Sequence, residues 1–481
     1  MKVSLVRHTA DAYETSVASA RTCYAADPVL PEDVSSTRQR RQVRDAIAAS
    51  TLAAGHLTTR QHAHFTFLIQ GVSRGVVWSF LHSHPHYNSE QVSQRYVPVK
   101  PEAFVMPPGL DGEELANWCD LVAYQVKAYQ QVAASLFPSV REEYFDRRPA
   151  RRQKADEHET AIRRLCLEDA RYLLPQSVKA NLYHTVSALT LLRYLRLAKR
   201  YEFADETTEL CRQMLDCVLE VDPLFDKDVE RVEDSEDPWA LDEEGDLPWE
   251  IDSARMAIKN AYSMLLDVSG AIDLDDPLLV GAIDPAENSI LLDNLGLQAM
   301  DRRTQITEFV HFTFLKALSL TADAQSQRHR AIRRYQTALP DVFPSPERIR
   351  TPVKVARCET TRRLYEDHVS EITLRGRSLH SVDPAPIHYT LPNGFVTHFI
   401  ETGSLAGFAH RWKMRLCLLA QDEIRQAAEE EVRDVMGLGE LQGIGAPCHI
   451  RHRGGVRPPC PEGDRFCGVR VWETPVGGPA T

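Results

Sequence analysis

The sequence predicts an α+β fold that is rich in helices and occurs as two tandem copies, with a small antiparallel sheet in each copy. The pentapeptide HFTFL is present twice, at His64–Leu68 and at His311–Leu315. Counting 18 residues onward from each of these histidines leads to another histidine, His82 in one half and His329 in the other. Two unrelated domains that share a short string are the alternative, but matches at one spacing favour duplication.

The elements of each copy follow from residue type and spacing. The runs KVSLVRH at 2–8 and HFTFLIQGV at 64–72 are rich in β-branched and aromatic residues, which is typical of strands. Apolar residues recur at helical spacing through 161–175, 177–200 and 406–436. These three segments are therefore expected to be helical.

Two weaker matches also support duplication. A predicted helix that ends with Ala204-Asp205-Glu206 is echoed by Gln421-Asp422-Glu423, and Tyr96 and Tyr335 follow the spaced histidines. An acidic run with two prolines, Glu233–Glu250, separates the halves and is typical of a linker. We therefore predict a first domain over 1–230, an acidic linker over 231–252, a second domain over 253–440 and a tail over 441–481.

Composition excludes several classes of protein. The chain has 481 residues, of which 43% are hydrophobic and 26% charged, as in ordinary globular proteins. No stretch approaches the ~20 apolar residues of a membrane-spanning helix, and the first residues lack a signal-peptide pattern. The net charge of −12 argues against bulk nucleic-acid binding, and ten scattered cysteines do not indicate a disulfide framework. We expect a cytoplasmic protein with no nucleic-acid or membrane partner.

The residues around both HFTFL strands resemble the signature region of the flavin-dependent thymidylate synthases. That family carries an Arg-His-Arg triplet, then a serine after seven residues, then Arg-Tyr. It places His-x-Ser/Thr and Glu-His before a Phe-Thr-Phe strand and ends with a helix similar to Leu-Arg-x-x-x-x-Ala-Gln-x-Glu-Ile. The resemblance extends from about Ala20 to about Met436, so it covers both halves.

The first copy resembles the family at the substrate end but not at the flavin triplet. The matching residues are Ser93, Gln94, Arg95 and Tyr96 at the substrate end, and His56 and Thr58 in the cofactor-binding motif before the strand. Leu81-His82-Ser83 stands where the triplet is expected, so only His82 remains for the cofactor. Two extra residues lie between this segment and Ser93.

The second copy shows the opposite pattern. It keeps the triplet as Arg328-His329-Arg330, preceded by Gln325 where the family has a substrate-contacting glutamine. It lacks the Ser-x-Arg-Tyr approach, and it has Arg303 and Gln305 where the first copy has His56 and Thr58. Two substrate arginines are divided between the copies: Arg171 aligns with His388, and Arg415 aligns with Ala198.

The resemblance implies an FAD-dependent enzyme that reductively methylates dUMP to dTMP, with methylene tetrahydrofolate and NADPH as cosubstrates. Guanidinium and imidazole groups suit a flavin dinucleotide, and arginine with a serine hydroxyl suits a nucleotide phosphate. We expect Ser93, Arg95 and Arg415 to act in catalysis. The family uses no cysteine nucleophile, so Cys23 and Cys166 are interpreted as buried small hydrophobic residues.

Because each copy has lost a different subset of residues, we expect complete sites to form only between unlike copies. Family members are homotetramers with sites between subunits, so a homodimer of this fused chain would imitate the tetramer. One alternative is a diverged flavoenzyme that acts on another pyrimidine nucleotide. Another is decay into a non-catalytic, nucleotide-binding scaffold.

Other signals are weaker. Cys448, Cys460 and Cys467 in the tail, with His449 or His452, allow a zinc site but lack a Cys-x-x-Cys pair. The alternating His82, His84 and His86 allow a metal site, although Pro85 favours a loop. Val6-Arg7-His8-Thr9 resembles the opening of histidine phosphatases, and the basic run Arg147–Lys154 allows a folate or phosphate contact but is more typical of a solvated loop end.

Overall fold

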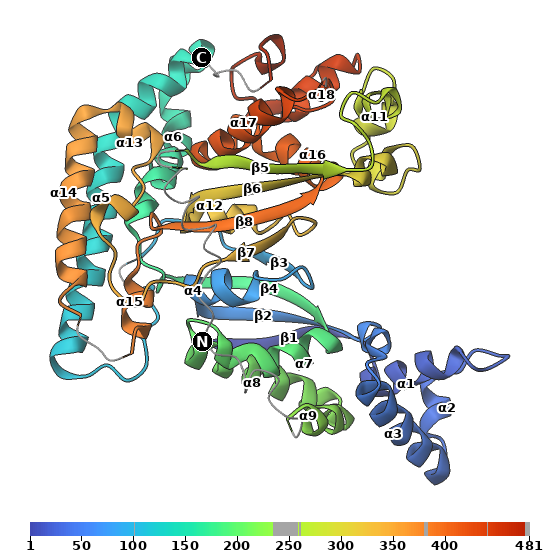
Figure 1. The fold of residues 1–481 in the computed structure, drawn as a ribbon. Helices are drawn as coiled ribbons and strands as arrows, with labels where there is room; N and C mark the ends of the chain where they lie inside the picture. Colours follow the sequence, from blue (N-terminus) through green and yellow to red (C-terminus); the bar gives the residue numbers. More distant parts are fainter. Residues whose placement is uncertain (101, 234–257, 259–260, 380–382, 440, 477–481) are drawn as a thin grey trace.

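The computed structural model describes residues 1–476 apart from 101, 234–257, 259–260, 380–382 and 440. It contains two four-stranded antiparallel sheets, one in each half (Figure 1). The strands follow the order β1-β2-β4-β3 in the first sheet and β5-β6-β8-β7 in the second. The predicted α+β architecture with a small sheet in each copy is confirmed.

The first half places its sheet among helices of very different length. Its strands are β1 (Lys2–His8), β2 (His64–Ser73), β3 (Asn88–Gln91) and β4 (Lys179–Ser187). Its helices are α1 (Ala12–Thr22), α2 (Pro31–Ser35), α3 (Arg38–Ala53), α4 (Arg74–Val76), α5 (Gly112–Asp146), α6 (Ala155–Ala170), α7 (Ala188–Leu197), α8 (Ala204–Val221) and α9 (Asp226–Glu233). Helices α1 to α3 project from the sheet as an arm (Figure 1).

The second half repeats the sheet with a different set of surrounding helices. Its strands are β5 (Ser263–Gly270), β6 (Val310–Ser319), β7 (Arg333–Gln336) and β8 (Val396–Ser404). Its helices are α11 (Pro277–Ile283), α12 (Leu320–Ser326), α13 (Val353–Arg357), α14 (Glu359–Gly376), α15 (Ala385–Thr390), α16 (Leu405–Arg415), α17 (Asp422–Met436) and α18 (Pro447–Arg453). Helices α5 and α14 pack side by side along one edge of the molecule (Figure 1).

The strand registers show that the HFTFL repeats occupy the same place in both sheets. In β2 the side chains alternate, so Phe65 and Phe67 are buried while His64 is exposed, as a one-sided sheet requires. Thr66 lies opposite Thr185 in the first sheet, and Thr313 lies opposite Thr402 in the second. This register fixes which residues of the two copies are counterparts.

The same register corrects one of the sequence matches. β3 and β7 pair with β4 and β8 so that Glu90, not Tyr96, is the counterpart of Tyr335. Continuing along the chain at this spacing places Ala338 where the first copy has Ser93. The two additional residues of the first copy lie in the turn before β3. The stretch from His82 to the start of β3 is longer than the stretch from His329 to the start of β7.

Reciprocal hydrogen bonds join the two halves. The Gly394 N–H donates to Tyr172 O at 2.7 Å, and the Ser177 N–H donates to Tyr389 O at 2.8 Å. The hydroxyl groups of these tyrosines also cross between halves: Tyr172 donates to Glu423 at 2.5 Å and Tyr389 donates to Glu206 at 2.7 Å. The edge strands β3 and β7 face each other across this junction (Figure 1).

Three predictions of local structure need correction. The segment 177–200 is not one helix, because Lys179–Ser187 forms β4 with alternating burial, and only Ala188–Leu197 is α-helical, followed by a 3-10 turn at Ala198–Arg200. The segment 406–436 is broken between α16 and α17 by residues 416–421. The start of the predicted linker is helical, since α9 extends to Glu233, and the remainder of that linker lies outside the described residues. The domain boundaries stay a prediction.

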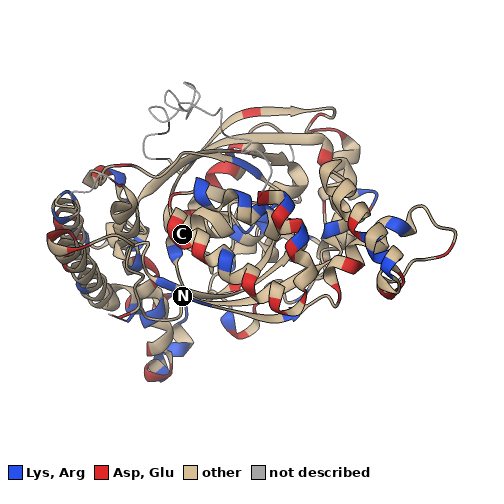
Figure 2. Ribbon diagram, turned by 90° about the horizontal axis from the view of Figure 1, so that it is seen from below, with Lys and Arg blue, Asp and Glu red and all other residues tan. Residues whose placement is uncertain are grey.

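Charge is mixed over the surface, and the helices are those of a globular protein. Figure 2 shows Lys and Arg interspersed with Asp and Glu along most helices. None of the helices formed by the described residues combines the length and apolar character that crossing a bilayer requires.

Candidate active site between the halves

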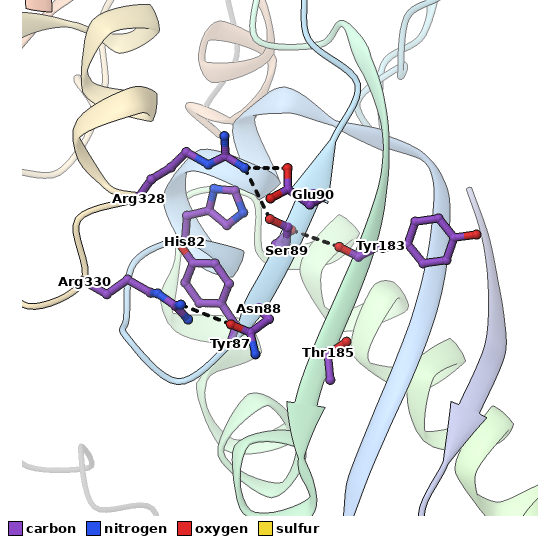
Figure 3. A pocket seen from close by; sticks show the side chains of 9 residues that line it. All are labelled: His82, Tyr87, Asn88, Ser89, Glu90, Tyr183, Thr185, Arg328 and Arg330. Atoms are coloured by element: carbon purple, nitrogen blue, oxygen red, sulfur yellow. Dashed lines mark hydrogen bonds and ion pairs between the residues drawn. The ribbon is translucent and has the colours of Figure 1, made fainter. Parts of the chain in front are cut away.

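The Arg-His-Arg triplet of the second half lies against the first half. Strand β6 ends at Ser319, which caps α12, and the chain leaves α12 with the triplet directed at the edge strand β3. Arg328 forms an ion pair of 2.8 Å with Glu90, and the Arg330 guanidinium donates to Asn88 Oδ1 at 3.1 Å (Figure 3). The triplet therefore contacts Glu90 and Asn88 of the first copy, whose counterparts in the second copy are Tyr335 and Arg333.

A cavity of about 330 Å³, called the triplet pocket below, lies at this contact (Figure 3). It is lined by His82, Tyr87, Asn88, Ser89, Glu90, Tyr183 and Thr185 from the first half and by Arg328 and Arg330 from the second. Both halves thus supply its walls, which is what the composite-site hypothesis requires, although the roles of these residues stay predictions.

An aromatic stack forms the floor of the triplet pocket. The rings of His82 and Tyr87 are parallel within 7° and 4.8 Å apart, and the Arg330 guanidinium lies 5.1 Å from the Tyr87 ring centre. Burial raises the pKa of Tyr87 to about 12 and lowers the pKa of His82 well below its ordinary value. Neither ring nitrogen of His82 nor the Tyr87 hydroxyl has a partner among the described residues.

Several arginines from both halves converge below this pocket. Burial, together with the charges of Arg328, Arg411 and Arg95, lowers the pKa of Arg415 to about 10. The Arg415 guanidinium donates to Gln325 O at 2.7 Å, while its Nε has no partner among the described residues. A buried guanidinium group whose pKa is lowered by neighbouring guanidinium groups is suited to an anion such as a phosphate.

Arg95 and Arg171 belong to this cluster and also reach across the junction. Arg95 forms an ion pair with Glu168 and donates to Leu419 O of the other half at 2.9 Å. Arg171 is buried and donates to Gln421 Oε1 at 3.1 Å. Burial, and then the charge of Arg95, lowers the pKa of Arg171, while Glu168 opposes this shift.

Gln325, Ser93 and Gln94 lie at the edge of the cluster. Gln325 hydrogen-bonds Gln421, the same side chain that accepts from Arg171, so these two predicted substrate residues are joined across the halves. Ser93 Oγ accepts the Arg95 N–H at 3.2 Å, which fixes the turn after β3. Gln94 is buried, and its amide nitrogen has no partner among the described residues.

Two predicted cofactor residues are not brought to the triplet. His56 and Thr58 are exposed where the turn Leu57–Gln61 begins, and neither lines a cavity that the triplet lines. In the second half, Gln305, which aligns with Thr58, lines a cavity of about 550 Å³ together with all three triplet residues. The segment before β6 in the second half therefore lies near the triplet of its own half, and the corresponding segment of the first half does not line a cavity with that triplet.

Arg74 is a site residue that the sequence did not reveal. It lies beside His82 in a small cavity, and burial together with the charge of Arg171 lowers its pKa to about 10. A signal was present, because Arg74 follows the helix cap Ser73 while the residue after the corresponding cap Ser319 is Leu320. An arginine at a buried strand end in one copy only is a candidate ligand contact.

A fourth cysteine lies near the three tail cysteines of the zinc hypothesis, but the described residues do not form a metal site. Cys448, Cys460 and Cys467 line one small apolar cavity together with Cys417, whereas the His449 ring approaches Thr474 O at 3.2 Å. Within the part of the chain that the structure describes, no three His, Cys, Asp or Glu side chains are placed to hold a metal ion together.

The remaining signals belong to ordinary local structure. His82, His84 and His86 lie in a turn rather than a strand, where His84 accepts the His86 N–H at 3.1 Å. His8 is exposed on β1. Cys166 is buried as expected, but Cys23 is exposed, so that interpretation was wrong for Cys23.

The basic run Arg147–Lys154 does not form an open anion site. Arg152 pairs with Glu142 and Asp146, and Lys154 pairs with Glu157. Arg147 pairs with Glu143. The other two arginines reach the tail, since Arg148 donates to Phe466 O at 3.1 Å and Arg151 to Asp464 O at 2.7 Å.

Comparison with known proteins decides the family. The sequence profile of the family described as Thymidylate synthase complementing protein matches residues 4–224 and again residues 255–438. The chain belongs to the flavin-dependent thymidylate synthase family. It contains two copies of the family's domain in tandem, and the predicted family and enzyme class are confirmed.

Individual relatives match one copy at a time. The flavin-dependent thymidylate synthase of Clostridium tetani is 25% identical over 225 residues, which are 46% of this chain and 84% of the relative. That of Nitratidesulfovibrio vulgaris is 29% identical over 226 residues, 44% of this chain and 83% of the relative. Since most of a relative aligns with less than half of this chain, the chain has the length of two family members.

The chain is also similar to a solved structure. Thymidylate synthase X from Helicobacter pylori, determined with FAD and dUMP, is 18% identical and is covered in full by 48% of this chain, with a TM-score of 0.31.

Proposed function

We propose that this protein is an FAD-dependent thymidylate synthase that converts dUMP to dTMP at a site built from both copies. The carrying observation is that Arg328 and Arg330 of the second half form the triplet pocket with β3 and β4 of the first half. Relatives named flavin-dependent thymidylate synthase and family members solved with FAD and dUMP support this choice of ligands.

The arginine cluster is the proposed site for the nucleotide phosphate. The charge of Arg95 contributes to lowering the pKa of both Arg171 and Arg415, so a dianion bound beside these guanidinium groups would offset their repulsion. Ser93 and Gln94 lie on the turn that leads into Arg95, and the free amide of Gln94 is available to a ligand. Removing charge repulsion on binding favours the phosphorylated nucleotide over the nucleoside.

The triplet pocket is the proposed site for the flavin ring system. Its orphaned donors and acceptors on His82 and Tyr87, and its two guanidinium groups, fit the polar edge of a flavin. The bound flavin would supply the electron transfer that reductive methylation needs. The protein's own part is to orient the nucleotide through Arg95 and Arg415 and to withdraw electron density from its ring.

The finer parts of the proposal rest on family resemblance. NADPH as reductant and methylene tetrahydrofolate as carbon donor are its cosubstrates, and the cytoplasm is the proposed location. A homodimer of the fused chain would complete the assembly, which mass determination in solution would check. A structural zinc ion at the tail cysteines is to be tested by comparing the metal content of Cys448→Ser with that of the unchanged protein.

The first test is the visible spectrum of the purified protein, with flavin per chain determined after denaturation. Bleaching by NADPH and reoxidation on adding dUMP with methylene tetrahydrofolate are expected. The variants Arg328→Gln and Ser93→Ala separate the two contributions, because each removes a residue from a different copy. If flavin and nucleotide affinity both survive each change, the composite site is wrong. A colourless protein that takes up no FAD would leave the nucleotide-binding scaffold as the better account.

A further inference from the structure

The duplication creates a counterpart of the triplet pocket on the other side of the junction. This second cavity, also of about 330 Å³, is called the histidine pocket. It is lined by His82, Ser83, His84, Pro85 and His86 from the first half and by Ser326, Gln327, His329, Arg330, Ile332, Arg333, Arg334 and Glu401 from the second. Asn88 pairs with Thr185 as Arg333 pairs with Thr402, so β3 and β7 line corresponding walls.

The arginines that line these two pockets come from different elements. In the triplet pocket the arginines come from the triplet, and the facing strand contributes Asn88 and Ser89. In the histidine pocket the triplet position supplies the neutral Ser83, while the strand positions carry Arg333 and Arg334. The first copy has thus lost its triplet arginines without its pocket losing cationic character.

Part of this charge is not neutralised. Arg334 is held by both oxygens of Asp323, at 2.6 and 2.9 Å. In contrast, Arg330 has no ion pair among the described residues: it donates to the neutral oxygens of Pro85 and Asn88 and lies over the Tyr87 ring. Arg333 makes no hydrogen bond or ion pair with any described residue.

The acidic group in the wall does not compensate for these charges. Glu401 is engaged by the buried Arg411 and Lys316. Arg193 on α7 is another positive charge without a partner among the described residues. Burial is the main cause that lowers the pKa of His84 and of His86, and the charge of Arg193 lowers both further. Among the described residues, the arginines that line the pocket therefore outnumber the acidic groups that pair with them.

Two histidines that line this pocket have buried ring nitrogens without a partner among the described residues. His82 is 5% exposed, and neither of its ring nitrogens has a partner among the described residues. The Nε2 atom of His329, on the opposite wall, also lacks one. A ligand with several oxygen acceptors would satisfy groups on both walls at once.

We propose that the histidine pocket binds a diphosphate-bearing ligand, held by Arg330 from the triplet wall and by Arg333 from the strand wall. Free guanidinium forks match phosphate oxygens, and two phosphate groups span walls that one phosphate does not. This site rests on the proposed function in sharing Arg330 and His82 with the proposed flavin site, whereas Arg333 lines the histidine pocket and not the triplet pocket.

Inorganic pyrophosphate is the probe, titrated into the full chain with its bound flavin by calorimetry at low salt. Arg333→Gln is expected to weaken binding about tenfold through the loss of a charge-assisted contact. Arg302→Gln, which changes an exposed arginine of the same half outside the pocket, is the matched control and should bind as the unchanged protein does. Orthophosphate should bind at least tenfold more weakly than pyrophosphate.

The outcomes distinguish this site from its neighbour. Equal affinity of Arg333→Gln and the unchanged protein overturns the proposal, as does equal affinity for orthophosphate and pyrophosphate. Weakening by Arg328→Gln alone would place the probe in the triplet pocket and would also overturn it. Flavin content is read from the same samples by absorbance, so a failure of the proposed enzyme function is recorded separately.

Discussion

At the scale of single residues, the site is marked by polar groups that the chain leaves unsatisfied. Most buried donors and acceptors in folded proteins are paired, because an unpaired one costs about 1–3 kcal/mol. Here His82, Tyr87, Gln94, His329 and Arg415 each keep a buried atom that has no partner among the described residues, and all lie at or near the junction between the halves. Such a concentration is expected where a ligand, rather than the protein, completes the hydrogen bonds.

Tyr87 allows a direct test of this interpretation. Tyr87→Phe removes the unpaired hydroxyl while keeping the ring that stacks on His82, so the free energy of unfolding of the ligand-free protein should rise by about 1 kcal/mol. Flavin affinity should fall if the hydroxyl is a ligand contact. Denaturant unfolding and flavin titration measure the two effects.

A lower stability of Tyr87→Phe would contradict this interpretation, since it would mean that the hydroxyl is satisfied inside the protein. Tyr124→Phe is a suitable control, because the Tyr124 hydroxyl does have a partner, the His368 ring at 2.8 Å. That variant should lose stability rather than gain it.

At the scale of elements, the two copies have sheets of the same topology but differ in the buried polar side chains that pack against those sheets. In the second half Lys316 on β6, Arg411 on α16 and Glu431 on α17 form a buried charge network, completed by Glu401. In the first half the corresponding positions are Ile69, Tyr194, Met214 and His184, and a His184–Tyr194 hydrogen bond of 2.9 Å replaces the charges.

The network predicts unequal costs for single and paired substitutions. Lys316→Ile leaves Glu431 short of a cation in a buried place and should lower the free energy of unfolding by about 3–5 kcal/mol. Lys316→Ile combined with Glu431→Met copies the first half at both positions and should cost less than the single change. Denaturant midpoints of the two variants decide this. A double variant less stable than the single one would show that Glu431 serves Arg411 more than Lys316.

A second buried set of charges links elements of opposite halves and predicts a pH dependence. Lys354 on α13 lies 3.1 Å from Asp169 on α6, and burial raises the pKa of Asp169 to about 7 despite this lysine. An acid whose pKa is higher in the folded state binds its proton more tightly there, so its contribution to stability is lost as the pH rises from about 4 to 7. Asp169→Asn should flatten the loss of stability over this range. An unchanged pH profile would assign the dependence to other groups.

Sequence patterns predicted the strands better than the helices. The HFTFL repeats placed β2 and β6 correctly because aromatic residues at every second position fit a one-sided strand and cannot share one face of a helix. The segment 177–200 was misread because apolar residues spaced by two and by four coincide over a short stretch, so β4 looked helical. Register could not be predicted, since it depends on pairing with β4 and β8, and so Tyr335 was matched to Tyr96 instead of Glu90.

The site was predictable in composition but not in arrangement. Motifs identified Arg328, Arg330, Arg95 and Arg415, yet only the fold shows that they come together from opposite halves. His56 and Thr58 were assigned to the same site because a motif carries no information about which copy it will face. Arg74, Tyr87 and Arg333 belong to no family motif and emerged only from burial, stacking and charge.

At the scale of the whole molecule, the two halves have sheets of the same topology, but different residues line the pockets between the halves. The reciprocal bonds of Tyr172 and Tyr389 to Glu423 and Glu206 hold the halves as a pseudo-twofold pair. The pockets on either side of this axis no longer match, because only one is walled by both triplet arginines. Duplication within one chain permits such divergence, whereas identical subunits must change together.

This asymmetry predicts one flavin per chain at saturation rather than two. The triplet pocket keeps the two arginines, while its counterpart has Ser83 in place of one of them and Leu81 in place of the other. Titration of the protein with FAD, followed by absorbance after removal of free flavin, gives the ratio. The paired change Arg328→Gln with Arg330→Gln should abolish this single site, and Arg333→Gln should leave the ratio at one. Two flavins per chain would show that the first copy binds the cofactor without its arginines, and the division of labour between the copies would then be wrong.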